Sequence, residues 1–315
     1  MQLIDALEDR ADRVFIEETP DNLRVEYADG WCVYIDGALA PIKKQAFDNL
    51  LNLLRIPIKY VERCVEDEGG IWLAQESINF WLERYGKLSF LTERIEGYDI
   101  PVITQVFPGK RLYLPGVKVN DLIIEYLGDC DVFSYSIEDD VFNAIYLTGR
   151  DEVIAGHNFR VGVRVLYSDC FTITPRFDGV LVDPGGAVLT WPTVGRKFRV
   201  ASNTVPQIIE QIYEFLDLSM KGLEESVVKA LGDFDNSTLV DAEKWITRLC
   251  SDLRQNKRLK AELMENCTAT PNHLPLELVL NVTSYVASGE ASVDLTTARE
   301  IQLAISNYIV NGTFK

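Results

Sequence analysis

The spacing of hydrophobic residues changes near Ser202, and this change constrains the fold of the 315-residue chain more than any other feature. Before it, β-branched and aromatic residues alternate with polar ones at the period of 2 that is typical of strands. After it, apolar residues recur at the helical period of 3.6. The sequence therefore predicts an α+β protein with N-terminal and central antiparallel β-meanders, interspersed helices and a helical C-terminal region.

The same change suggests two parts of the chain. We expect residues 1–203 to form an α+β domain with a central antiparallel sheet, and residues 204–315 to form a helical region packed on it. Residues 12–200 should then carry all of the β-structure. No stretch approaches the 18 uncharged apolar residues of a membrane span, and the N-terminus lacks the basic start of a secretory signal. We expect a protein of the cytoplasm without membrane contact.

Alternation and turn residues locate the first elements. Pro20-Asp21-Asn22 and Asp29-Gly30 are turn signals, so the three strands around them should form a hairpin or a meander. Outside the central meander, strands are expected at residues 14–19, 23–28, 31–35, 87–95, 100–107, 131–137 and 141–147. Helices are expected at 42–54 with Pro41 in the first turn, 57–64, 71–85, 122–127 capped by Asn120-Asp121, 204–231, 238–265, 276–287 and 295–310.

The stretch 151–200 is predicted to be a central meander with turns at Asp178-Gly179 and Pro184-Gly185-Gly186. It differs from the rest of the chain in charge. Residues 150–200 hold 7 basic and 5 acidic side chains, whereas the whole chain has a net charge of −17. A slightly positive sheet on a strongly acidic protein is the best candidate for a working surface.

Scarce basic residues lie in this meander. Arg160 and Arg164 have even spacing and should share one face of a strand. Arginines with aromatic residues on a sheet can hold single-stranded nucleic acid through phosphate contacts and base stacking. The candidate binding residues are Arg160, Arg164, Arg176, Arg196, Lys197 and Arg199, interleaved with Tyr167, Phe171, Phe177, Trp191 and Phe198. The alternative is that the aromatic residues belong to the core and the arginines to its rim.

Other chemistry has weak support. The net charge of −17 opposes binding to anionic membranes and broad binding to duplex DNA. No glycine-rich phosphate loop is present, and six scattered cysteines with two histidines predict reduced thiols, no metal and no cofactor. His157 near Asp151, Glu152 and Asp169 is an acid/base candidate but is better explained as a loop histidine. Cys267 with His273, and the acidic runs 66–68 and 138–140, are interpreted as structural or solvated.

Three blocks carry a family resemblance, and together they cover about residues 45–312. The first is FDNLLNLLRIPIKYVERC followed by ESINFWLERYGKLSFLTERI; the others are HNFRVGVRVLYSDCFTITPRFDGVL and LVLNVTSYVASGEASVDLTTAREIQLAISNYIVNG. They resemble the phage/plasmid-like proteins of unknown function that travel on mobile elements. The chain departs from that family at VFPGKRLYLPG, where a serine-aspartate-arginine-tyrosine step is usual, and at Arg176-Phe177-Asp178-Gly179, where a cysteine-threonine-asparagine-glycine turn is usual.

The resemblance implies a setting and no reaction. Our first hypothesis is a non-enzymatic bacteriophage or plasmid protein that handles DNA intermediates, with single-stranded DNA as partner, and that works as a homo-oligomer. The alternatives are a virion structural or assembly protein and an acidic inhibitor of host defence. The partner would then be another phage or host protein, and the location the host cytoplasm or the virion.

Overall fold

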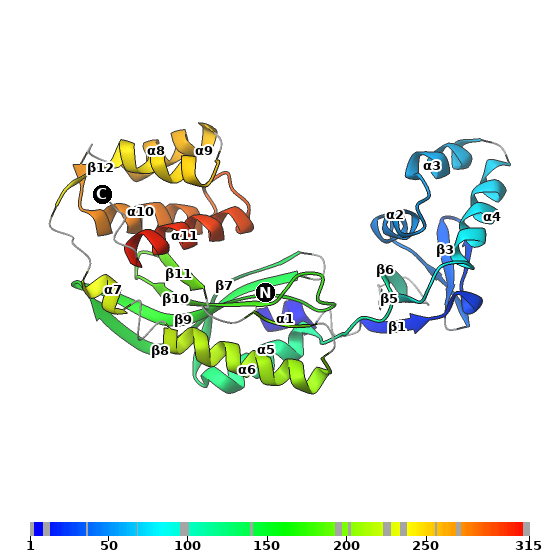
Figure 1. Cartoon of the computed structure of the whole chain (residues 1–315), viewed down its shortest axis with the longest axis horizontal. Coiled ribbons are helices and arrows are strands. Elements are labelled where there is room, and N and C mark those ends of the chain that lie inside the picture. The colour runs from blue at the N-terminus through cyan, green and yellow to red at the C-terminus, as the bar shows by residue number, and fades with distance from the viewer. Residues whose placement is uncertain are drawn as a thin grey trace. The chain divides into compact units, whose positions relative to one another are not determined.

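A computed structural model describes residues 3–8, 13–35, 37–67, 69–94, 101–138, 141–192, 197–200, 203–222, 228–233, 238–255, 257–268 and 272–310. The chain divides into two compact units, residues 1–117 and 118–315 (Figure 1). Antiparallel sheets occur in the N-terminal and central parts and helices follow, so the predicted α+β class is confirmed. None of the helices in the described part of the chain has the length and apolar character needed to cross a bilayer.

The first unit holds two three-stranded antiparallel sheets. One has the order β1-β5-β6, with β1 (Val14–Glu18), β5 (Leu88–Glu93) and β6 (Val102–Pro108); the other has the order β2-β3-β4, with β2 (Arg24–Tyr27), β3 (Trp31–Ile35) and β4 (Ala38–Pro41). Of the hairpin or meander expected over residues 14–35, the β2–β3 hairpin is present, but a meander that includes the first strand is wrong. A 3-10 turn at Pro20–Asn22 separates β1 from β2, and β1 pairs with β5 instead.

The helices of the first unit cover a core that both sheets share. They are α2 (Lys44–Leu53), α3 (Ile58–Glu66) and α4 (Gly70–Leu82); α1 (Leu3–Glu8) precedes β1, and its buried Leu3 and Leu7 lie outside this core. Pro41, expected in the first turn of a helix, instead ends β4, a strand without β-branched residues that the alternation pattern missed. The Asn79 side chain ties α4 to β2 by accepting from the Val25 amide at 2.7 Å and donating to the Val25 carbonyl at 2.9 Å.

The turn between α3 and α4 depends on two glycines. Gly69 has a φ of 83°, a conformation that other residues rarely adopt. A Cβ on Gly70 would lie 2.4 Å from the Cys64 carbonyl oxygen, so α4 can start this close to α3 only without a side chain there. Of the acidic run 66–68, expected as a solvated turn, Glu66 and Asp67 are exposed between the two helices, and Glu68 lies outside the described residues.

The second unit is built on one five-stranded antiparallel sheet of order β11-β10-β9-β8-β7. The strands are β7 (Cys130–Glu138), β8 (Val141–Ile154), β9 (His157–Ser168), β10 (Arg176–Val182) and β11 (Val188–Pro192). Ala155 and Gly156, with φ of 50° and 83°, make the turn between β8 and β9. The predicted turn at Asp178-Gly179 is wrong, because both residues pair within β10; the turn at Pro184–Gly186 lies between β10 and β11 as expected.

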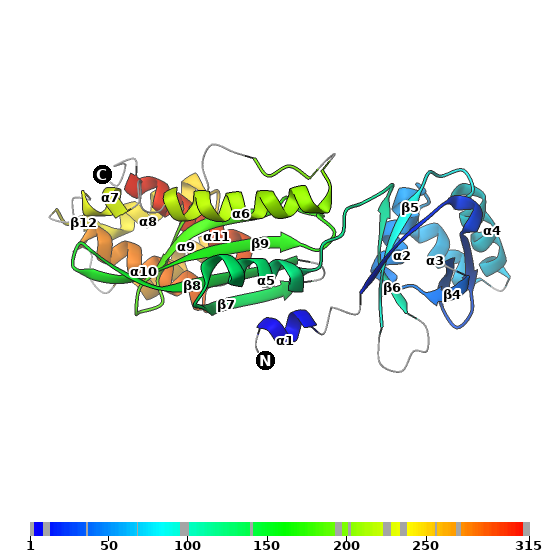
Figure 2. The same ribbon diagram turned by 90° about the horizontal axis from the view of Figure 1, so that it is seen from below.

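Helices cover both faces of this sheet (Figures 1 and 2). On one face lie α5 (Gly116–Leu127) and α6 (Val205–Gly222); on the other lie α10 (Pro275–Ala287) and α11 (Leu295–Val310). Asn120, expected to cap a short helix, lies inside α5, is buried and accepts a hydrogen bond from the Tyr146 hydroxyl at 2.9 Å. Its buried partner on β8 explains why a polar residue occupies the helix interior.

The boundary expected at 203/204 falls inside the second unit, since sheet and C-terminal helices share one core that includes Phe159, Leu189 and Ile305. The remaining helices are α7 (Val228–Gly232), α8 (Ala242–Asp252) and α9 (Lys257–Cys267). One helix had been expected over 238–265, but α8 ends before Arg254, whose φ is 52°. The two-residue strands β12 (Val240–Asp241) and β13 (Asn272–His273) correct the expectation that all β-structure precedes residue 201.

Candidate functional site

The structure separates the basic residues that the sequence grouped together. Arg164 is buried, with 7% of its surface exposed, and therefore does not face solvent as the nucleic-acid hypothesis required. Arg160 is partly exposed and pairs with Asp131 at 3.0 Å. Arg176, Lys197 and Arg199 are exposed, whereas Arg196 lies outside the described residues. The five aromatic residues expected beside them, Tyr167, Phe171, Phe177, Trp191 and Phe198, are all buried.

Arg164 belongs to a buried polar cluster between the sheet and α11. Strand register places Arg164 opposite Asp178, so the two side chains share one sheet face. Arg299 of α11 donates to Asp178 Oδ2 from Nε at 2.8 Å and from Nη2 at 2.6 Å. Arg164 and Thr190 both donate to Oε1 of Gln302 on the same helix. This cluster fixes α11 on the sheet, and that is a structural role.

Burial changes the acidities in this cluster. It raises the pKa of Asp178, while the neighbouring Arg299 and Arg164 guanidinium groups oppose that shift. Burial also lowers the pKa of Arg164 to about 10, so this guanidinium still carries its charge at neutral pH. Two buried cations thus face one carboxylate, which requires that each of them keeps its hydrogen-bond partners.

The exposed basic residues form one smaller group. The Phe177 and Phe198 rings lie in contact, with centroids 5.9 Å apart. Arg176 precedes Phe177, and Lys197 and Arg199 flank Phe198, so this contact joins the backbone segments that carry the three cations. On β10 the Arg176 side chain lies on the sheet face of Asp178, opposite to Phe177. We call Arg176, Lys197 and Arg199 the basic group.

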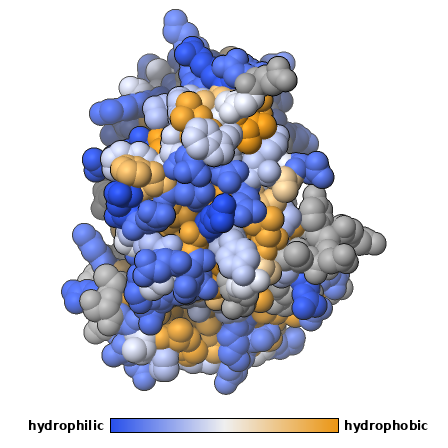
Figure 3. All heavy atoms as spheres, turned by 90° about the vertical axis from the view of Figure 1, so that its right-hand side faces the viewer, coloured by the Kyte–Doolittle hydropathy of each residue, from blue (hydrophilic) through white to orange (hydrophobic). Residues whose placement is uncertain are grey.

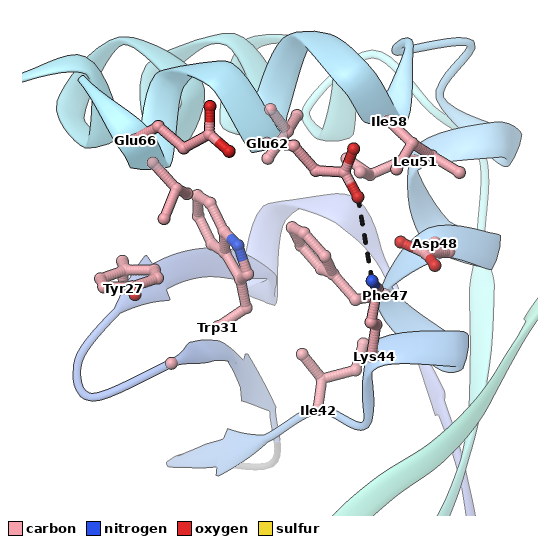
Figure 4. A pocket seen from close by; sticks show the side chains of 13 residues that line it. Tyr27, Trp31, Ile42, Lys44, Phe47, Asp48, Leu51, Ile58, Glu62 and Glu66 are labelled. Carbon is pink, nitrogen blue, oxygen red and sulfur yellow. Dashed lines mark ion pairs between the residues drawn. The ribbon is translucent and has the colours of Figure 1, made fainter.

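A better-formed site lies in the first unit, where the sequence had suggested only core. A pocket of about 650 Å³ opens between β3, α2 and α3 (Figure 4). Its lining is apolar at the bottom and charged at the rim. The lining residues are Tyr27, Gly30, Trp31, Ile42, Lys44, Phe47, Asp48, Leu51, Ile58, Val61, Glu62, Val65 and Glu66.

Aromatic rings form one wall of the pocket. Trp31 of β3 stacks on Phe47 of α2 with centroids 4.7 Å apart and planes inclined by 17°. Tyr27 meets the indole edge-on at 5.1 Å. Phe47 is buried, but Tyr27 and Trp31 are only half-buried, so part of their surface is open to a ligand. Their positions follow from the β2–β3 hairpin, which pairs Tyr27 with Trp31.

Carboxylates dominate the rim. Glu62 and Glu66 are one turn apart on α3 and extend on the side of the Trp31 and Phe47 rings, and Asp48 approaches from α2 (Figure 4). Lys44 lies 3.8 Å from Glu62, and both side chains are largely exposed. With three acids and one lysine, the rim favours a positively charged ligand.

The pocket can bind but has few groups for catalysis. Among the described residues that line it, none is a histidine or cysteine, and only Tyr27 carries a side-chain hydroxyl. Elsewhere, the described residues form no group of three or more metal-ligating side chains. His273 is buried, with Nδ1 3.8 Å from Glu277, and burial raises the pKa of Cys267 to about 12, so that this thiol is not activated.

Sequence reasoning missed this pocket although it found its elements. Phe47 and Leu51 fall within the expected helix 42–54, Val61 within the expected helix 57–64, and Trp31 within the expected strand 31–35. The available signal was the pair of acids at Glu62 and Glu66, spaced by four on a helix whose opposite face is apolar. Nothing in that spacing says which strand faces the acids.

Comparison with known proteins adds no relative. The chain matches no protein-family model, and it shows no significant similarity to any curated protein or solved structure. The resemblance to phage/plasmid-like proteins therefore stays a prediction, and the pocket in the first unit is the feature on which a functional assignment can be built.

Proposed function

We propose that the protein is a non-catalytic binding protein whose first unit captures a cationic group attached to an apolar one. An organic ammonium ion, or a lysine or arginine side chain of a partner protein, has this chemistry. One observation carries the proposal: the half-buried rings of Trp31 and Tyr27 lie below a rim of three carboxylates.

Two physical effects support a cation over a neutral ligand. A cation near an aromatic face gains about 0.5–2 kcal/mol, depending on how far it is desolvated. The carboxylates of Glu62, Glu66 and Asp48 add attraction, and the net charge of −17 raises the encounter rate with cations. A volume of about 650 Å³ also suits a small organic group or one large side chain.

Lys44 is the natural competitor of such a ligand. Its side chain is 81% exposed and that of Glu62 is 52% exposed, so their pair is solvated. Exposed pairs contribute about 0–1 kcal/mol, and a ligand ammonium can therefore replace Lys44 at Glu62 at small cost. The lysine keeps the empty rim partly neutralised without closing the pocket.

Titration calorimetry with three matched probes tests the proposal. Phenethylammonium should bind, whereas the anionic 3-phenylpropionate and its neutral amide should bind at least about tenfold more weakly. The double variant Glu62→Gln, Glu66→Gln should lose about tenfold in phenethylammonium affinity. The control variant Glu243→Gln, Glu300→Gln removes two exposed acids from the second unit and should bind as the wild type does. Equal affinity for the anionic probe would refute the proposal.

A second candidate function rests on the basic group. Arg176, Lys197 and Arg199 are three exposed cations on two segments that meet at the Phe177–Phe198 contact of an otherwise acidic protein, and this supports binding of single-stranded DNA. Each lost phosphate contact lowers the log–log salt slope of binding by roughly 0.7. The triple alanine variant should flatten the slope by about 2 in fluorescence anisotropy with a labelled oligonucleotide. Absence of wild-type binding at low salt would remove this candidate.

The biological setting remains part of the proposal. The resemblance to phage/plasmid-like proteins supports a bacteriophage or plasmid system, in the host cytoplasm or in the virion, as the setting of this binding activity. A pocket for cationic side chains suits recognition of another phage or host protein. It is equally compatible with the virion-assembly and host-defence hypotheses, which the identity of a bound partner would separate.

A further inference from the structure

Helix α4 of the first unit is apolar on two faces. Ala74, Ile78 and Leu82 point into the core and are fully buried. On the outer side, four large apolar side chains are exposed: Trp72 by 66%, Leu73 by 48%, Phe80 by 49% and Trp81 by 50%. Large apolar side chains of a helix are normally packed against a partner, and the outer apolar residues of α4 are exposed in the described part of the chain.

The four exposed residues form one surface. At about 100° per residue, Trp72, Leu73, Phe80 and Trp81 fall within about half of the helix circumference. The Phe80 and Trp81 rings are in edge contact, with centroids 5.4 Å apart. Figure 3 shows the side of the molecule on which α4 lies, where apolar side chains interrupt a mostly hydrophilic surface. We call these four residues the α4 patch.

Acidic residues border the patch. A groove of about 560 Å³ runs beside α4 and the Pro20–Arg24 segment, and Phe80 belongs to both groove and patch. The groove residues are Pro20, Asp21, Leu23, Arg24, Glu76, Asn79, Phe80 and Glu83. Two cations lie beside these three carboxylates and are already engaged: Arg24 pairs with Glu26 at 3.3 Å, and Arg84 lies over the Phe80 ring at 3.7 Å and 3.6 Å from Glu83. No lining residue is shared with the pocket of the proposed function.

This charge distribution selects among possible occupants. A second copy of the chain, related by a two-fold axis, would bring Glu76 and Glu83 near the same acids of its partner. An anionic membrane would meet the same repulsion. We propose that the α4 patch and its groove bind a basic amphipathic helix of a partner protein, with the partner's apolar face on the tryptophans and its lysines or arginines at the groove.

The residue types fit this role. Tryptophan is enriched among the residues that dominate binding energy at protein interfaces. An amphipathic helix lying on an apolar strip is a recurrent recognition mode, in which side chains at i, i+3, i+4 and i+7 make the contacts. Asp21, Glu76 and Glu83 then set the partner's orientation and exclude acidic competitors.

The test uses the full chain and a tryptophan-free probe. The probe is a synthetic helix of about 18 residues, five turns, with leucine on one face and lysine on the other. Binding should shift the tryptophan emission to the blue and protect it from acrylamide quenching, because Trp72 and Trp81 become buried. The variant Trp72→Gln, Trp81→Gln should lose at least about tenfold in affinity measured by anisotropy of the labelled probe.

Controls separate the occupants. Val153→Gln with Leu239→Gln removes two exposed apolar residues of the second unit and should leave affinity unchanged. Glu62→Gln with Glu66→Gln should also leave it unchanged, so failure of the pocket proposal and failure of this one are distinguishable. Two results with peptides would overturn the inference: equal affinity for a peptide with glutamate in place of lysine, or no binding of the lysine probe up to about 1 mM. Two other results would also overturn it. One is protection of the tryptophans from quenching by anionic vesicles alone, and the other is a wild-type dimer that the double tryptophan variant abolishes.

Discussion

Aromatic and charged side chains occur together in two regions of this protein with opposite outcomes. In the pocket, Trp31 is half-buried and Glu62 is exposed. In the central meander, Phe177 and Trp191 are buried, and Arg164 with Asp178 lies beneath α11. The difference shows that the exposure of such a surface to a ligand depends on which elements cover it and not on its composition.

The comparison assigns different tasks to charge in the two regions. Arg164, Asp178 and Arg299 hold a helix on a sheet, so their removal should reduce stability. Glu62 and Glu66 stand on the rim of a pocket, so their removal should reduce binding and leave stability nearly unchanged. Variants that show the reverse pattern, with binding lost in the buried cluster or stability lost at the rim, would contradict this assignment.

The largest effect is expected for Arg299→Met. It leaves the Asp178 carboxylate buried without the cation that donates two hydrogen bonds to it. Loss of one partner from a buried pair costs about 3–5 kcal/mol of unfolding free energy. Urea denaturation should show this loss, whereas Glu62→Gln with Glu66→Gln should stay within about 0.5 kcal/mol of the wild type. A loss below about 1 kcal/mol for Arg299→Met would contradict the structural role.

Gly162→Ala should have the next largest effect. A Cβ at this position of β9 would lie 2.1 Å from the Tyr146 carbonyl oxygen on the neighbouring strand. Backbone cannot move aside cheaply in a buried sheet, and overpacking there costs about 1–3 kcal/mol. Gly149→Ala is the matched control, since an added Cβ there meets nothing within 4 Å. Equal midpoints of thermal unfolding for the two variants would show that the meander tolerates an extra methyl group.

Arg164→Met sharpens the contrast between buried and exposed arginines. The variant removes the Arg164 hydrogen bond to Gln302 on α11 but keeps much of the side-chain volume, so a loss of about 1–3 kcal/mol is expected. Arg176→Met changes an exposed arginine twelve residues later and should cost less than about 0.5 kcal/mol. Equal stabilities in urea would place Arg164 at the surface, as the sequence had suggested.

The smallest effect concerns thiol reactivity. Five of the six cysteines are buried, and Cys130 is partly exposed at the start of β7. A disulfide reagent should therefore label about one thiol quickly in the native protein, and Cys130→Ser should remove that phase. Burial first, then Asp131 and Asp129, raises the pKa of Cys130, so its rate at pH 8 should be below that of free cysteine and rise with pH. Rapid labelling of two or more thiols would show that cysteines other than Cys130 are accessible to the reagent and would contradict their burial.

Local sequence patterns predicted many of the helices and strands but not which distant elements pack over them. The strands β8 and β9 followed from alternation, and α10 and α11 from helical periodicity. Even spacing correctly suggested that Arg160 and Arg164 share a face, but it carried no information about α11, which buries one of them. The Asp178-Gly179 pair is a turn signal in sequence. In this fold both residues pair within β10, and the Asp178 carboxylate accepts hydrogen bonds from the distant Arg299.

The pocket was hidden for the same reason. Periodicity identifies Phe47 and Val61 as inward-facing and Glu62 as outward-facing. It does not show that the β2–β3 hairpin returns beside α3, which converts the outward acids into a rim above Trp31. Such contacts depend on residues that are far apart in the chain, and single-sequence patterns report only near neighbours.

The pairing of Arg299 with Asp178 also affects how the protein emerges from the ribosome. The two residues are 121 positions apart, so at ordinary rates of translation Arg299 is synthesised on the order of 10 s after Asp178. During that time the strands of the meander, including Arg164 opposite Asp178, are complete in sequence but lack α11, which supplies Arg299. Completion of this unit is therefore delayed until α11 has been synthesised, and a chain interrupted before Arg299 would be a substrate for chaperones and proteases.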